Sequence, residues 1–134
     1  MKKFAMMFVL LSLVAAFLTA CSGPGGCGSS SSGCSNGGTP TVHMCGNNFE
    51  QSSITISKGQ SLTLIDDASA GHVIANGSWI NGSAQLSQEA SAPTVNNLQF
   101  NGNDIHAIRP FNTTGTFHLY CTVHPGMNLT VIVQ

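Results

Sequence analysis

The sequence predicts an all-β domain that follows a short targeting segment and a flexible linker. After residue 41, apolar residues alternate with polar ones in short runs, which is the period of strands with one buried face. Gly-rich turns separate these runs, and no stretch after the first twenty residues has helical periodicity. Several short strands in a domain of this length favour a β-sandwich or a barrel.

Residues 1–20 have the pattern of a secretory signal peptide. Lys2 and Lys3 give a charged start, and the run from Phe4 to Leu18 is almost wholly apolar. A membrane span needs about twenty apolar residues, so this shorter core fits a cleaved signal better. We therefore expect residues 1–20 to be removed during export.

Cys21 directly follows this segment and is the predicted lipidation site. The ending Leu18-Thr19-Ala20-Cys21 resembles the lipobox of bacterial lipoproteins, in which the Cys becomes the lipidated first residue. The resemblance implies an extracytoplasmic protein, lipid-anchored to the cell membrane or periplasmic. The alternative is ordinary secretion, with Cys21 as a spare thiol, because short motifs also occur by chance.

The stretch from residue 21 to residue 41 is predicted to be a flexible linker. It consists almost entirely of Gly, Ser, Pro, Cys, Asn and Thr and has no apolar periodicity. About twenty such residues reach roughly 25 Å as a random coil. The linker would hold a folded domain, residues 42–134, close to the membrane surface.

The first expected strands of this domain form a hairpin. Ile54 and Ile56, then Leu62 and Leu64, alternate with polar residues on either side of a turn at Lys58–Gly59. This pattern is typical of two paired strands with one buried face.

Four more strands are expected further along the chain, and residues 80–97 show little pattern and are predicted to form a long loop or ragged edge. Turns are expected at Asn76–Gly77 and at Thr113–Gly115. The four strands are residues 72–74, 105–108, 117–121 and 129–133.

The segment from Cys121 to Met127, near the end of the chain, contains the residues that indicate a metal site. Phe117, Leu119 and Cys121 alternate with polar residues, so a strand delivers the thiol of Cys121 to its inner face. His124 and Met127 follow at equal steps of three. A thiolate, an imidazole and a thioether suit a soft transition metal, and two His and one Cys with a weak axial Met form the blue-copper arrangement.

This segment resembles the cupredoxins, the type 1 blue copper proteins of the amicyanin and plastocyanin kind. Its Cys-x₂-His-x₂-Met spacing, with Pro125 after the His, is most similar to amicyanin, because plastocyanin has two more residues between the His and the Met. The resemblance covers roughly residues 42–134. It implies a Greek-key β-sandwich of about eight strands, with one type 1 copper ion at one end among the loops. It also implies that electrons enter and leave through His124, near the surface.

A second imidazole must come from elsewhere in the chain, and His72 is the predicted ligand. His43 and His106 are rivals, but His72 alone lies near the start of an apolar strand, at the place where the family has its upstream His. His43, His106 and His118 are expected to be unpaired surface imidazoles. The predicted copper ligands are therefore His72, Cys121, His124 and Met127.

The predicted function is transfer of single electrons between extracytoplasmic redox proteins, without enzyme activity. Four ligands leave no open position for a substrate, and the sequence lacks the further His clusters that a copper oxidase would need. The alternative is copper binding for storage or for delivery to an oxidase, which would use the same ligands.

The charge of the chain excludes one class of partner. After the signal, Lys58 and Arg109 are the only basic residues, against five acidic ones. Nucleic-acid binding depends on basic residues that neutralise phosphates, so we expect none. We expect a monomer that meets redox partners through shape and apolar contact.

Three cysteines remain after Cys21 and Cys121 are assigned. In an extracytoplasmic protein, Cys27 and Cys34 could form a disulfide within the linker, which would leave Cys45 single. The other interpretation is a second metal site made by these thiols with His43, although a flexible linker would have to be ordered to form it.

Overall fold

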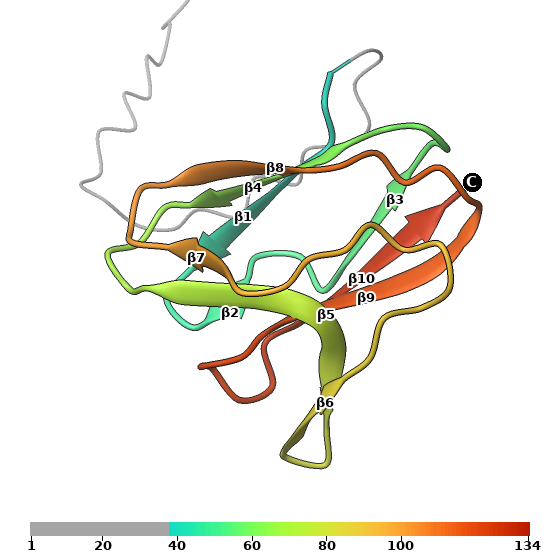
Figure 1. The fold of residues 1–134 in the computed structure, drawn as a ribbon. Helices are drawn as coiled ribbons and strands as arrows, with labels where there is room; N and C mark the ends of the chain where they lie inside the picture. Colours follow the sequence, from blue (N-terminus) through green and yellow to red (C-terminus); the bar gives the residue numbers. More distant parts are fainter. Residues whose placement is uncertain (1–37) are drawn as a thin grey trace, which may run out of the picture.

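The computed structural model describes residues 38–134, which form a sandwich of two β-sheets (Figure 1). The signal peptide, Cys21, the Cys27–Cys34 pair and most of the linker lie outside the described residues. None of residues 38–134 is helical, so this part of the chain has no helix with the length and apolarity that crossing a membrane needs. The predicted all-β fold class is confirmed, with ten strands where about eight were expected.

The first sheet has the strand order β2-β1-β4-β8. Its strands are β1 (Thr41–Cys45), β2 (Asn48–Phe49), β4 (Leu62–Asp66) and β8 (Ile105–Ile108). Strands β1 and β4 run parallel, and β4 and β8 run antiparallel.

The second sheet has the strand order β3-β10-β9-β5-β6, and β7 also pairs with β5. The central pairs β10–β9 and β9–β5 are antiparallel. Its strands are β3 (Ser53–Ile56), β5 (His72–Ile80), β6 (Ser83–Leu86), β7 (Leu98–Phe100), β9 (Gly115–Cys121) and β10 (Asn128–Val133).

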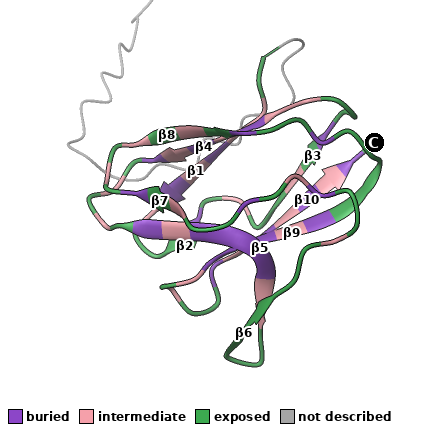
Figure 2. Ribbon diagram, viewed as in Figure 1, coloured by how far each residue is buried: buried purple, intermediate pink, exposed green. Residues whose placement is uncertain are grey.

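The core lies between the two sheets and is made by the inward-facing residues of their strands. Burial alternates along β1, β4 and β10, as the strand period requires (Figure 2). The two faces meet through fully buried aliphatic side chains, including Val42, Leu64, Leu119 and Val131. The alternation predicted from the sequence is therefore the alternation that forms the core.

The expected hairpin around Lys58–Gly59 is wrong, although both of its strands exist. Strand β3 pairs with β10, whereas β4 pairs with β1 and β8 in the other sheet. The turn does form, and Gly59 adopts a φ of 87° there and donates its N–H to the Phe111 carbonyl at 2.8 Å. This turn crosses between the sheets because each strand finds its partner far along the chain.

The expected turn at Asn76–Gly77 is also wrong, because β5 continues through it to Ile80 and then folds back into β6. Gly77 has a φ of 130°, and a Cβ there would lie 2.1 Å from the Gln85 carbonyl oxygen. Glycine thus lets β5 bend sharply while β6 stays paired to it (Figure 1). Part of the predicted loop 80–97 is therefore a hairpin.

Candidate metal centre

Three potential metal ligands that are distant in the sequence meet at one end of the sandwich. His72 Nδ1 lies 3.2 Å from His124 Nδ1 and 3.8 Å from Cys121 Sγ, and His124 Nδ1 lies 3.4 Å from Cys121 Sγ. The three ligand atoms lie within 4.8 Å of one another, and this is the one such group of His, Cys or carboxylates among residues 38–134.

Strand pairing brings His72 to Cys121 across 49 residues of sequence. Strand β5 begins at His72 and β9 ends at Cys121, and because the strands are antiparallel these two ends lie together. Ile74 pairs with Cys121, and the Thr122 N–H donates to the Val73 carbonyl at 2.8 Å, which extends the ladder into the loop. The position of His72 is therefore set by backbone hydrogen bonds.

The loop from Cys121 to Met127 is closed by its own backbone. The Cys121 N–H donates to the Met127 carbonyl at 3.0 Å, and the Met127 N–H donates to the His124 carbonyl at 3.2 Å. Gly126 takes a φ of 82°, which lets the loop turn back within so few residues. His124 is held above Cys121, and Met127, only 1% exposed, ends the loop inside the core.

The centre is buried on one side and open on the other. His72 and Cys121 are both 0% exposed, whereas His124 is partly exposed and its neighbour Val123 is 53% exposed. Burial lowers the pKa of His72 below its usual 6.5, the Asp66 carboxylate opposes this, and His124 adds to it. A lowered pKa keeps the imidazole neutral, which metal ligation requires.

The other three histidines of the described domain lie outside this cluster. His106 packs edge-on against Phe100, with ring centroids 4.7 Å apart. His43 and His118 were expected to be unpaired, and this is wrong. His43 Nδ1 lies 2.5 Å from Asp67 Oδ2, and His118 Nδ1 lies 2.6 Å from Glu89 Oε1. These carboxylates are too far along the chain for a sequence pattern to reveal them.

Two residues near the centre were not identified from the sequence. Asp66 is fully buried, and its Oδ1 lies 3.7 Å from His72 Nε2. Trp79 donates its indole N–H to the Cys121 carbonyl at 2.7 Å. Asp66 continues the inward alternation of Leu62 and Leu64, so the strand period was a signal that could have identified it. No local pattern connects Trp79 to Cys121.

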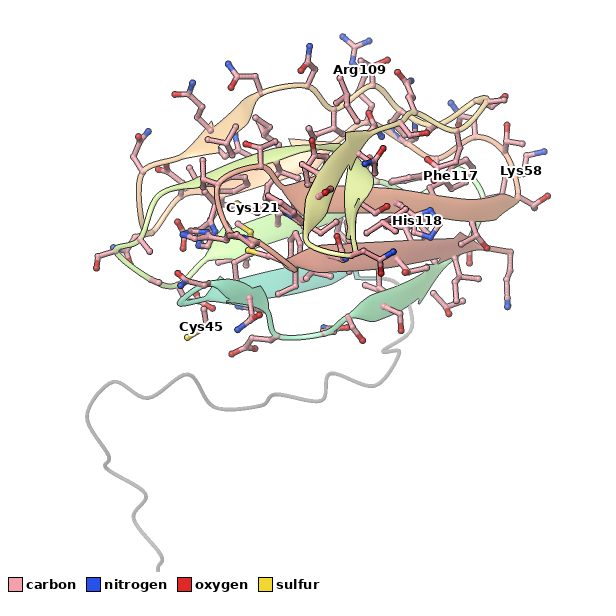
Figure 3. The ribbon with its side chains drawn as sticks, turned by 90° about the horizontal axis from the view of Figure 1, so that it is seen from below. Cys45, Lys58, Arg109, Phe117, His118 and Cys121 are labelled. Atoms are coloured by element: carbon pink, nitrogen blue, oxygen red, sulfur yellow. The ribbon has the colours of Figure 1, made fainter. Side chains whose placement is uncertain are left out.

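The cysteines of the described domain have different states. Cys121 is free and buried, as metal ligation requires. Cys45 is disulfide-bonded, which corrects the expectation that it would remain single. Cys45 ends β1 in a partly exposed position. Figure 3 shows Cys45 and Cys121 toward the same end of the domain and Lys58 at the opposite end.

The donor set fits copper. One thiol and two imidazoles converge with no carboxylate among them, and ligands of this softness select copper over magnesium, calcium or manganese. A buried thioether follows in the same loop, at Met127.

Comparison with known proteins agrees with this chemistry. Residues 39–134 match the family of copper-binding proteins that includes plastocyanin and azurin. No curated protein sequence matches the chain.

Several solved structures of amicyanin share the fold. Amicyanin from Paracoccus versutus is 23% identical with a TM-score of 0.55, over 72% of this chain and 81% of that protein. A reduced Cu(I) form of a proline-to-glycine amicyanin mutant at pH 4 is 18% identical with a TM-score of 0.56, over 73% of this chain and 84% of that one.

The family match covers the whole described domain apart from its first residue, and the converging donors lie within it. The domain thus has a site for one type 1 copper ion. The chain belongs to the plastocyanin/azurin family of copper-binding proteins.

Proposed function

We propose that this protein carries single electrons on a copper ion that His72, Cys121, His124 and Met127 would hold. The observation that carries the proposal is the convergence of three donors in a site that is buried on the side of His72 and Cys121. Bound copper supplies a one-electron couple. The protein supplies a donor set whose members are already adjacent, so little must move between the two oxidation states.

The arrangement favours a carrier over an enzyme. Two imidazoles, a thiolate and an axial thioether leave no open position for a substrate. Residues 38–134 contain no second cluster of metal-binding side chains that could act as a catalytic centre. The proposal therefore includes no enzyme activity.

Electrons would enter and leave at the exposed side of the site. His124 is the one partly exposed member of the three-donor cluster, and Val123 beside it presents an apolar surface to solvent. A redox protein that docks on this surface would come within contact of a copper ligand. We propose extracytoplasmic redox proteins as partners of a monomeric carrier.

The carrier would act outside the cytoplasm, held at the membrane by a lipid on Cys21. The Leu-x-Ala-Cys ending supports this proposal. Two acyl chains give stable attachment, whereas one binds only marginally. Replacing Cys21 with Ala should move the protein from the membrane fraction to the soluble one, whereas Ser29→Ala in the linker should leave it attached. Retention of the Cys21 variant in membranes would favour an uncleaved signal as the anchor.

The central experiment is to add Cu(II) to the purified mature protein and record its visible spectrum and voltammogram. We expect an intense visible band from the Cu–thiolate bond and reversible one-electron cycling. The rival function, copper storage or delivery to an oxidase, predicts ready loss of Cu(I) to an added chelator instead. His106→Ala is the matched control, because His106 lies outside the cluster, and it should keep the band.

A further inference from the structure

A buried carboxylate lies behind the metal centre, on the side away from Cys121. Asp66 is 0% exposed, and its Oδ1 accepts the Ala68 N–H at 3.1 Å. The same oxygen lies 3.7 Å from His72 Nε2. Asp66 Oδ2 and His72 Nε2 are both buried without a hydrogen-bond partner. An unpartnered imidazole nitrogen thus lies near a carboxylate that has one unpartnered oxygen.

The backbone fixes where Asp66 lies. It is the last residue of β4, with its N–H bonded to the Asp104 carbonyl at 2.9 Å, and it pairs with Met44 of β1. Leu62 and Leu64 point into the core, and the strand period turns Asp66 the same way. The carboxylate is therefore a built feature of the sheet and not a mobile surface group.

The burial of this carboxylate needs compensation, because an ionised group removed from water is stable only when it is paired or hydrogen-bonded. Within residues 38–134, each close contact between a carboxylate and a basic side chain is made to a histidine, and that of Asp66 is made to His72. Lys58 lies at the opposite end of the domain, where its N–H bonds the Gln134 carbonyl (Figure 3). Among the residues that the structure describes, His72 is therefore the basic side chain that pairs with Asp66, and a metal bound by His72 would bring positive charge close to this carboxylate.

We propose that Asp66 is the positioning residue of His72 and that it sets the reduction potential of the site. Its carboxylate accepts the Nε2–H of His72, which leaves Nδ1 without a proton and directed at Cys121 and His124. The inference rests on the proposed function, since it needs His72 as a ligand. Metal-binding histidines commonly donate their second N–H to a carboxylate or carbonyl, which fixes the tautomer and the ring orientation.

The present distance of 3.7 Å between His72 Nε2 and Asp66 Oδ1 is longer than this bond. An N–H···O bond spans about 2.7–3.2 Å, so Nε2 and Oδ1 need to approach by roughly 0.5–1 Å. His72 would lose no existing hydrogen bond by this approach, because its Nε2 has no partner among the described residues.

The negative charge of Asp66 should change the reduction potential of the site in one direction. A site with one thiolate carries one more positive charge with Cu(II) than with Cu(I), so a nearby buried carboxylate stabilises the oxidised form more. Asp66 thereby lowers the reduction potential. In a poorly screened interior this effect persists at high salt, unlike that of a surface charge.

The decisive comparison is between Asp66→Asn and Asp67→Asn. Asn keeps the size of Asp and an oxygen that can accept the Ala68 N–H, but it removes the charge. Asp67 is the next residue, but its side chain is 43% exposed and pairs with His43. The two variants therefore remove the same charge from buried and exposed positions.

We expect Asp66→Asn to shift the preference from Cu(II) toward Cu(I) by about tenfold, a rise of about 59 mV in the potential. Asp67→Asn should shift it much less, and by an amount that falls with added salt. Equal shifts in the two variants, or none in Asp66→Asn, would overturn the assignment. A purely structural role for Asp66 would lower the melting temperature and leave the potential unchanged.

A second measurement needs no variant and so does not depend on whether Asp66→Asn folds. In nitrogen-15 NMR of the diamagnetic Cu(I) protein, the His72 Nε2–H should appear as a hydrogen-bonded proton that exchanges slowly with solvent. A rapidly exchanging Nε2–H would contradict the bond to Asp66. The metal-free wild-type protein should show the same Nε2–H tautomer, and an Nδ1–H tautomer there would also count against it.

The proposed function and the role of Asp66 can be disproved separately. A wild-type protein that shows no visible band with Cu(II) would remove the proposed function. A wild-type protein with the band and reversible cycling, together with an Asp66→Asn variant of unchanged potential, would remove only the role of Asp66.

Discussion

The two imidazoles of the metal centre come from regions that are built in opposite ways. His72 begins β5, a strand paired on both sides, and it is wholly buried in front of the buried carboxylate of Asp66. His124 stands in a short loop, partly exposed, beside the solvent-exposed Val123. One region holds its ligand in place, and the other presents its ligand to the surroundings. The electron carrier that we propose needs both, since its metal must be retained while electrons pass through.

The largest effect is expected where the two regions meet, at Cys121. Cys121→Ser should abolish the intense visible band, because that band requires a Cu–thiolate bond. The domain should remain folded, since Ser is close in size to Cys, and circular dichroism checks this. An unchanged visible spectrum in a folded variant would remove Cys121 from the site.

The contrast between the histidines is tested by removing each side chain and offering imidazole from solution. His124→Gly should lose the band and regain it with added imidazole, because the opening reaches the surface. His72→Gly should lose the band and not regain it, because its opening is enclosed. The visible spectrum during an imidazole titration measures both. Recovery of both variants would show that the β5 side is as accessible as the loop.

A smaller effect is expected from the axial position. Met127→Gln replaces a thioether with a harder oxygen ligand, which favours Cu(II) over Cu(I). We expect Cu(II) to be favoured over Cu(I) by about tenfold more than in the wild-type protein, which lowers the reduction potential by about 59 mV. Voltammetry measures the shift, with Met44→Gln as a control for a polar change at a buried methionine outside the loop. A potential that does not move would make Met127 a core residue only.

The smallest effect concerns the metal-free protein in acid. Burial holds the pKa of His72 below its usual 6.5, so as pH falls below about 6.5 the unfolded chain takes up this proton before the folded one does. Unfolding therefore becomes easier across the window between 6.5 and the lowered folded value, and stability returns as pH rises.

Thermal melts of metal-free wild-type protein and His72→Gln, from about pH 7.5 to about pH 5.5, isolate this effect. The melting temperature of the wild-type protein should fall more steeply toward acid than that of the variant. Parallel curves would mean that the burial of His72 does not make stability depend on pH. The environments of His72 and His124 would then differ less than their burial indicates.

Local periodicity was sufficient to predict most of the strands but not how they pair. The expected strands at residues 105–108, 117–121 and 129–133 all exist, because alternation reports directly which side chains face the core. The hairpin at Lys58–Gly59 does not exist, because pairing is decided by partners far along the chain. The strands β1, β2, β6 and β7 were not predicted, and β2 (Asn48–Phe49) has too few residues to show a period.

The sequence by itself determined the chemistry of the loop, since Cys121, His124 and Met127 lie within seven residues of one another and a short turn leaves them close together. It also determined the all-β class, through alternation that any strand must obey. Only the tertiary structure decided that His72, and not His43 or His106, reaches Cys121, because antiparallel pairing of β5 with β9 selects it. The same packing buried Asp66 behind His72. From the sequence alone an aspartate is expected at the surface, and only the packing of the two sheets buries Asp66.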